Sequence, residues 1–68
     1  MSAVPIRAIV DLVCARTIKI GQPVYFNEIK AEVERESEGP VGDGYLASTI
    51  EDLGYRVSDA TLPWIVSR

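Results

Sequence analysis

The sequence predicts a small α+β domain in which three helices and a short strand precede a C-terminal β-hairpin. The expected order is helix, strand, helix, helix, strand, strand. Two observations predict it. Apolar residues recur at helical spacing in three segments, and each segment is followed by a turn containing glycine. After Gly54 the period changes to two, because Tyr55 and Val57 alternate with polar residues.

Length and composition indicate one globular domain, residues 1–68, whose first four residues are expected to be frayed. Apolar residues make up 47% of the chain and charged residues 25%, which is typical of a folded protein. A chain of this length buries only ~60% of the surface that its unfolded form exposes. The domain is therefore expected to fold with little stability in reserve.

The chain has one cysteine and no histidine. It therefore has no intramolecular disulfide or cysteine-based zinc site, and it lacks the commonest general base. Asp11, Asp43 and Asp59 fall on a helix face, a helix N-terminus and a turn, where structural roles explain them. The sequence predicts no enzymatic activity, no cofactor and no metal.

No signal peptide or membrane span is expected, because the apolar segment 8–14 is short and is interrupted by Asp11. This pattern predicts a cytoplasmic protein without a membrane partner. The chain is also acidic, with a formal net charge of −3.

Residues 5–16 are predicted to form the first helix. Pro5 suits a first helical turn. Four apolar residues of this segment fall on one stripe: Ile6, Ile9, Val10 and Val13. Cys14 borders this stripe, so a buried thiol is expected there and not a reactive one.

A connector over residues 17–22 is expected to end in a turn, with Ile18 or Ile20 tucked beneath it. Residues 23–26 then predict a short strand, because β-branched and aromatic residues follow the turn.

Asn27 is predicted to cap a second helix over residues 28–37, with Ile29 and Val33 pointing inward. The Glu-Gly-Pro sequence at residues 38–40 is expected to end this helix. The glutamates at residues 28–38 most simply form a hydrated face. Two alternatives are docking on a basic partner and binding of a divalent cation, although no histidine or Asp-rich loop completes a metal site.

The third helix is expected after a short link over residues 38–42. Asp43 is a suitable N-cap, and Gly54 can adopt the left-handed conformation that ends a helix. Its apolar positions are Leu46, Ile50 and Leu53.

The hairpin is predicted to pair residues 55–58 with residues 64–67 through a turn at 59–61. Pro63 cannot donate to a ladder, so it is placed at the start of the returning strand or on an open edge. Two registers are compatible with the pattern. In one of them Ile65 points outward, away from a face formed by Tyr55, Val57, Trp64 and Val66.

This order of elements resembles that of a winged helix-turn-helix domain. The resemblance extends over residues 6–66, and the segments that carry it best are PVYFNEI and LASTIEDLGYRV. In that family the third helix enters the major groove of DNA, and the hairpin, or wing, contacts nearby phosphates or the minor groove. The contact residues implied by the resemblance are Gly44, Tyr45, Ala47, Ser48 and Glu51 on the helix, with Arg56, Thr61 and Arg68 on the wing.

The charge distribution disfavours DNA as the partner. Residues 24–54 contain eight acidic residues and two basic ones, and the third helix has no Lys or Arg to neutralise phosphates. Three features still allow DNA binding. These are the hydroxyl groups of Tyr45, Ser48 and Thr49; the N-terminal N–H groups of the third helix; and a basic edge formed by Lys19, Arg56 and Arg68.

Two hypotheses about function remain open. In the first, the domain is a non-enzymatic module of a transcription or replication system that binds another protein or a second copy of itself, and its acidic face helps to select the partner. In the second, it is a dimeric DNA-binding transcriptional regulator that uses the third helix and the wing arginines. The charges favour the first hypothesis, whereas the resemblance favours the second.

Overall fold

The structure is a computed structural model of the 68-residue chain and describes residues 5–58 and 63–68. Its six elements confirm the predicted α+β class and order. They are α1 (Ile6–Thr17), β1 (Val24–Tyr25), α2 (Phe26–Ser37), α3 (Asp43–Asp52), β2 (Arg56–Ser58) and β3 (Ile65–Ser67). The turn predicted at residues 59–61 and the N-terminal residues 1–4 lie outside the described residues.

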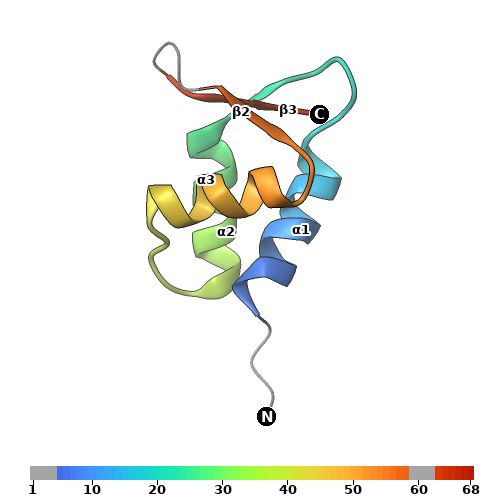
Figure 1. The fold of residues 1–68 in the computed structure, drawn as a ribbon. Coiled ribbons are helices and arrows are strands. Elements are labelled where there is room, and N and C mark those ends of the chain that lie inside the picture. Colours follow the sequence, from blue (N-terminus) through green and yellow to red (C-terminus); the bar gives the residue numbers. More distant parts are fainter. Residues whose placement is uncertain (1–4, 59–62) are drawn as a thin grey trace.

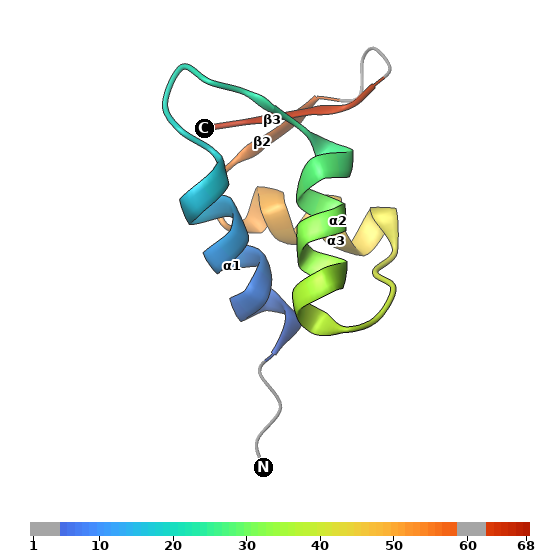
Figure 2. The same ribbon diagram turned by 180° about the vertical axis from the view of Figure 1, so that it is seen from behind.

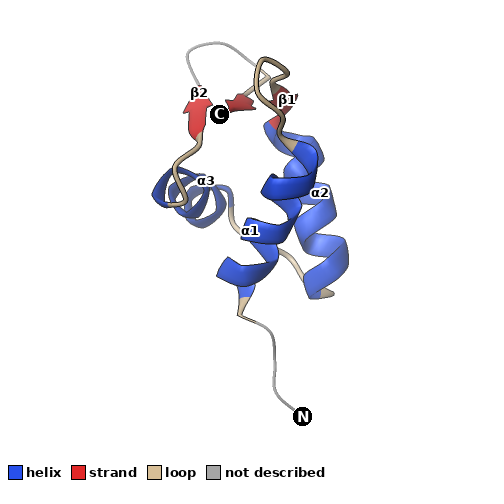
Figure 3. Ribbon diagram, turned by 90° about the vertical axis from the view of Figure 1, so that its right-hand side faces the viewer, coloured by secondary structure: helices blue, strands red, loops and turns tan. Residues whose placement is uncertain are grey.

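The helices and the sheet form two layers (Figure 1). Helices α1 and α2 lie side by side, and α3 crosses on one side of them (Figure 2). The antiparallel sheet has the strand order β1-β3-β2 and lies across one end of the helices (Figure 3). No described helix covers its outer face.

A row of three valines connects the sheet to the helices. Val66 of β3 pairs with Val24 of β1 on one side and with Val57 of β2 on the other. Val66 is fully buried, and the other two pack against the core. Ile65, one residue earlier, is only partly buried. The register is thus the one in which Ile65 points outward. Of the two predicted registers, only this one turns the three valines toward the helices.

The core confirms most of the inward positions predicted for the three helices. The buried residues of the helical stripes are Ile9, Val10, Val13, Cys14, Ile29, Val33, Leu46 and Ile50. Ile6 departs from its stripe, since it lies in the first turn of α1 and is 37% exposed. Of the two connector isoleucines, Ile18 is fully buried and Ile20 is 86% exposed.

Both helix caps predicted from single residues are wrong. Helix α2 begins at Phe26, directly after strand β1. The Phe26 N–H donates to the main-chain oxygen of Trp64 (2.9 Å), and this bond fixes the start of the helix beside the sheet. Tyr25 is the N-cap, and its N–H donates to the Glu28 carboxylate (3.3 Å). Helix α3 is capped by Gly42, so Asp43 is its first residue. Asn27 and Asp43 therefore lie inside the helices.

The ends of α2 and α3 confirm the predicted turns. Glu38 takes the left-handed conformation (φ 58°) and ends α2. Gly54 has a φ of 101° just after α3 and turns the chain toward β2. The strands are shorter than predicted, since Tyr55 precedes β2 and Trp64 precedes β3.

Candidate interaction surface

The candidate contact residues of α3 lie mostly on its exposed side. Gly44, Tyr45, Ser48 and Glu51 are exposed, whereas Ala47 is half-buried against the core. Tyr45 is 52% exposed, which makes it a large apolar group at the surface. We call the exposed group of Gly44, Tyr45, Ser48 and Glu51 the α3 surface. The structure therefore brings together four of the five predicted helical contacts.

Thr49 does not belong to the α3 surface. It is only 6% exposed, and its hydroxyl donates to the main-chain oxygen of Tyr45 one turn earlier (2.8 Å). Buried polar groups usually find such a partner within the fold. The sequence-based interpretation of the Thr49 hydroxyl as a donor to DNA is therefore wrong.

Carboxylates flank the α3 surface at both ends. Asp43 accepts a hydrogen bond from the Lys30 ammonium (2.6 Å), and this contact raises the pKa of Lys30. Asp52 lies 4.0 Å from the Arg7 guanidinium. Glu51 has no ion pair among the described residues. Helix α3 itself carries three carboxylates and no Lys or Arg, but cations of α1 and α2 lie beside two of them, so Glu51 supplies the net negative charge of this side.

Two of the three wing candidates lie within the described residues. Arg56 is exposed on β2, and Thr61 lies outside the described residues. Arg68 follows β3 at the end of the hairpin opposite its turn, close to the end of α1 (Figure 1). Its Nε donates to the Ile18 oxygen (2.8 Å), and its guanidinium carbon lies 5.3 Å from the centroid of the Tyr55 ring. Arg68 thus has a structural role in addition to the wing contact that the resemblance implies.

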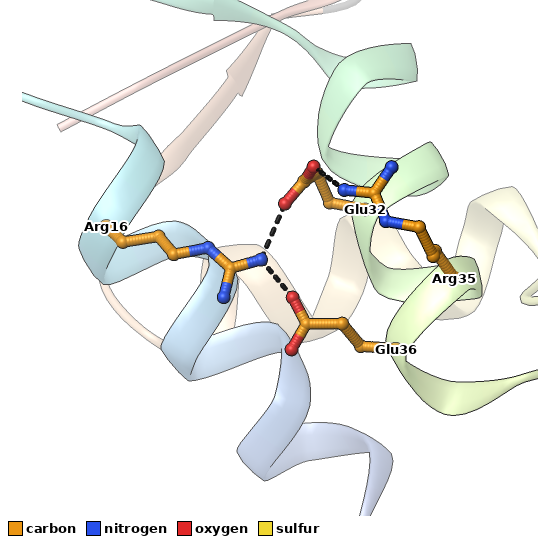
Figure 4. A network of polar contacts seen from close by, with 4 residues as sticks. All are labelled: Arg16, Glu32, Arg35 and Glu36. Carbon is orange, nitrogen blue, oxygen red and sulfur yellow. Dashed lines mark hydrogen bonds and ion pairs between the residues drawn. The ribbon is translucent and has the colours of Figure 1, made fainter.

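The glutamate-rich face of α2 is partly a structural network (Figure 4). Arg16 of α1 donates to Glu32 (2.5 Å) and also to Glu36, and Arg35 donates to Glu32. The hydrogen bond from Arg16 is the main cause of a lowered pKa at Glu32. The spacing of Glu32 and Glu36, one helical turn apart, is the sequence signal that could have indicated a bridging arginine.

Two further glutamates of α2 bind main-chain N–H groups. The Glu34 carboxylate accepts from Val41 (2.8 Å) in the link to α3, and Glu28 accepts from Tyr25. The hydrated face predicted for this run is therefore largely occupied by contacts that hold neighbouring segments.

The described residues offer little reactive chemistry. They contain no group of three or more Cys, Asp or Glu residues that could hold a metal ion. Burial, and secondly the charge of Asp11, raises the pKa of the Cys14 thiol to about 11. None of the described helices has the length and apolar character needed to cross a membrane. Comparison of the chain with protein-family models, curated proteins and solved structures found no match.

Proposed function

We propose that this domain is a non-enzymatic module of winged-helix type, which acts in a transcription or replication system by binding another protein. The contact surface in this proposal is the α3 surface. The observation that carries it is that Tyr45 and Glu51 are both exposed on a helix without Lys or Arg, and that Glu51 has no ion pair within residues 5–58 and 63–68. The element order and its resemblance to winged helices support the nucleic-acid-handling context. The cytoplasm is the proposed compartment.

The chemistry of the α3 surface favours a basic partner. A tyrosine presents a large apolar area with a polar tip, which is why tyrosines are enriched at protein interfaces. Asp43 and Asp52 already have cations beside them, so the carboxylate of Glu51 is the one that attracts Lys or Arg and repels phosphates. A protein surface that combines basic and apolar groups therefore complements this helix better than a DNA backbone does.

Direct DNA binding by a dimeric regulator is the second candidate function. It is favoured by the exposed N-terminal turn of α3, which contains Gly44, and by the exposed Arg56 on β2. Helix N-termini can bind phosphate through their free N–H groups. Under this alternative the wing cations would supply the phosphate contacts that α3 lacks.

A DNA titration separates the two functions. We expect no binding of the domain to a pool of random duplexes at low salt, whereas a regulator would bind and would lose affinity steeply as salt increases. Ser48→Arg places a cation on the α3 surface, and Leu12→Arg places the same charge on the exposed side of α1. The protein-contact proposal would be overturned if the wild type binds DNA and if Ser48→Arg strengthens this binding more than Leu12→Arg does.

A peptide-selection experiment tests protein binding directly. From a displayed library of random peptides we expect enrichment of sequences that combine Lys or Arg with apolar residues. Their affinity should fall in Tyr45→Ala and in Glu51→Gln, and it should be unchanged in Leu12→Ala, which removes an exposed side chain from α1. Selected peptides that bind all three variants equally would exclude the α3 surface.

A further inference from the structure

The turn between α1 and β1 carries a large apolar side chain that the fold does not use. The Gln22 N–H donates to the Lys19 oxygen (3.0 Å) and closes a tight turn, in which Gly21 has a φ of 77°. This geometry requires the glycine but not an isoleucine before it. Ile20 is nevertheless 86% exposed, more than any other large apolar residue in the described part of the chain.

An open groove begins at both ends of this turn. One part is a shallow, open depression of about 740 Å³, lined by Arg16, Thr17, Val24, Glu28, Ala31 and Glu32. A second part of about 250 Å³ shares Val24 and Glu28 and adds Pro23, Tyr25 and Ile65. We call the two parts together the α1–α2 groove. Figure 2 shows the elements that form it, with α1 and α2 in front and the connector and β1 above them.

The groove combines apolar groups, two carboxylates and the Arg16 guanidinium, which is bound to Glu32 and Glu36. Val24 and Ile65 are half-buried there, and Tyr25 is 52% exposed. Glu28 is exposed, and it has no ion pair within the part of the chain that the structure describes. Glu32 is already bound by Arg16 and Arg35, so Glu28 is the carboxylate that is open to an incoming cation. A segment with an apolar side chain beside a cation fits these groups.

The turn itself presents that chemistry. Lys19 precedes Ile20, is exposed, and has no ion-pair partner in the described ranges 5–58 and 63–68. We infer that the α1–α2 groove binds the Lys19–Ile20 turn of a second copy of this chain. Each copy buries its Ile20 against Val24 and Tyr25 of the partner subunit and places its Lys19 beside Glu28 of the partner subunit.

The positions of turn and groove satisfy the symmetry of such a dimer. In a two-fold interface the same patch meets itself, so both complementary parts must lie next to each other on one chain. Thr17 and Val24 line the groove and flank the turn in the sequence, which places the two parts side by side. A contact of this size is smaller than a standard interface, so a weak and concentration-dependent dimer is expected.

Sedimentation velocity over a range of about 10 μM to 1 mM tests the inference, since a weak dimer has a Kd in that range. We expect the mass of the wild type to increase from monomer to dimer. Ile20→Ser should weaken self-association by about a hundredfold or more, because the burial of two isoleucines, one from each copy, is lost. Leu12→Ser removes the next most exposed aliphatic side chain, from the outer side of α1, and should leave self-association unchanged. A wild type that stays monomeric, or equal effects of the two substitutions, would overturn the inference.

A charge exchange tests the Lys19 to Glu28 contact and controls for misfolding. Lys19→Glu and Glu28→Lys each place like charges at both contacts of a homodimer, so each variant alone should associate more weakly than the wild type. In a mixture of the two, every contact of the heterodimer pairs opposite charges, and association should return close to the wild-type level. A misfolded variant could not restore it. A mixture that associates no better than the separate variants would contradict the proposed contact.

Self-association and the proposed function can fail independently. The α1–α2 groove lies on α1, α2 and β1, and α3 lies behind these helices in Figure 2. The inference rests on the proposed function only in that both concern protein contacts. Tyr45→Ala and Glu51→Gln should leave self-association unchanged, and Ile20→Ser should leave peptide binding by α3 unchanged. Loss of self-association in Tyr45→Ala would place the dimer contact on α3 and would contradict the proposed contact in the α1–α2 groove.

Discussion

Arg68 donates a hydrogen bond from its Nε to the main-chain oxygen of Ile18, 2.8 Å away and fifty residues earlier. Its guanidinium also lies over the ring of Tyr55, 5.3 Å from the centroid. One side chain at the end of β3 therefore holds both the connector after α1 and the segment before β2. The resemblance to winged helices assigned Arg68 to DNA contact, whereas in the structure it joins two segments of the fold.

Replacing Arg68 with alanine should destabilise the domain. The charged hydrogen bond and the cation–π contact are both lost, and because Arg68 is exposed we expect the free energy of unfolding to fall by about 1 kcal/mol. Urea denaturation measures this change. Arg56→Ala is the matched control, since the Arg56 side chain is exposed and makes no hydrogen bond or ion pair with a described residue. Equal stability of the two variants would contradict a structural role of Arg68.

Stability should decrease in acid partly through Glu32. The hydrogen bond from Arg16, and a second one from Arg35, lower the pKa of Glu32 below its ordinary value of 4.5. A carboxyl whose pKa is lower in the folded state stabilises the fold above the unfolded-state pKa. This contribution is lost as the pH falls from 4.5 through the lower folded-state value.

Arg16→Met, which keeps an apolar stem, should therefore make the free energy of unfolding less dependent on pH below about 4.5. Chemical denaturation at a series of pH values measures this slope. Arg7→Met removes an arginine that lies near Asp52 (4.0 Å) and should keep the wild-type slope. If both variants have the wild-type slope, the network of Figure 4 does not control the acid response.

Gly54→Ala should destabilise the junction between α3 and β2. Gly54 has a φ of 101°, and a Cβ there would meet no other group within 4 Å, so the cost comes from the backbone conformation alone. We expect a loss of about 1 to 2 kcal/mol in thermal or urea unfolding. Gly39→Ala is the control, because that position is equally open and does not have a positive φ. There the substitution should be neutral or slightly stabilising.

The Cys14 thiol should react slowly in the folded protein. Its pKa is raised to about 11 by burial, with a smaller effect of Asp11, so the thiol is protonated at pH 8. Alkylation by iodoacetamide at that pH should be at least about a hundredfold slower than that of an ordinary cysteine, because the thiolate is the reactive form. Denaturant should restore the rate, and fast labelling without denaturant would show that Cys14 is accessible.

Much of the fold could be predicted from the sequence because the relevant signals are local. The inward positions of α1 to α3 follow from a helical period. The turn at Gly54 follows from its position between a segment of helical period and a segment in which apolar residues alternate. The predicted cap of α2 was wrong for a nonlocal reason. Asn27 is a good capping residue, but the hydrogen bond between Phe26 and Trp64 sets the start of α2 one residue before it.

The candidate site was predictable only in part. The exposed positions of α3 follow from the same helical period, and Tyr45, Ser48 and Glu51 are exposed as expected. The burial of Thr49 follows from that period too, because Thr49 lies three residues after Leu46 and four before Leu53, but its polar side chain suggested exposure. The hydrogen bond of Arg68 to Ile18 could not be predicted, because it joins residues fifty positions apart. Single-residue interpretations of hydroxyl and guanidinium groups therefore needed the structure.

By itself, the amino-acid sequence determined which segments become helices or strands and which of their sides carry apolar groups, since both are properties of neighbouring residues. Only the tertiary structure decided that β1 joins the hairpin beside β3 and that Arg16 bridges Glu32 and Glu36. These contacts join residues sixteen or more positions apart. Their geometry is set by packing the helices against the sheet, and no periodicity along the chain encodes it.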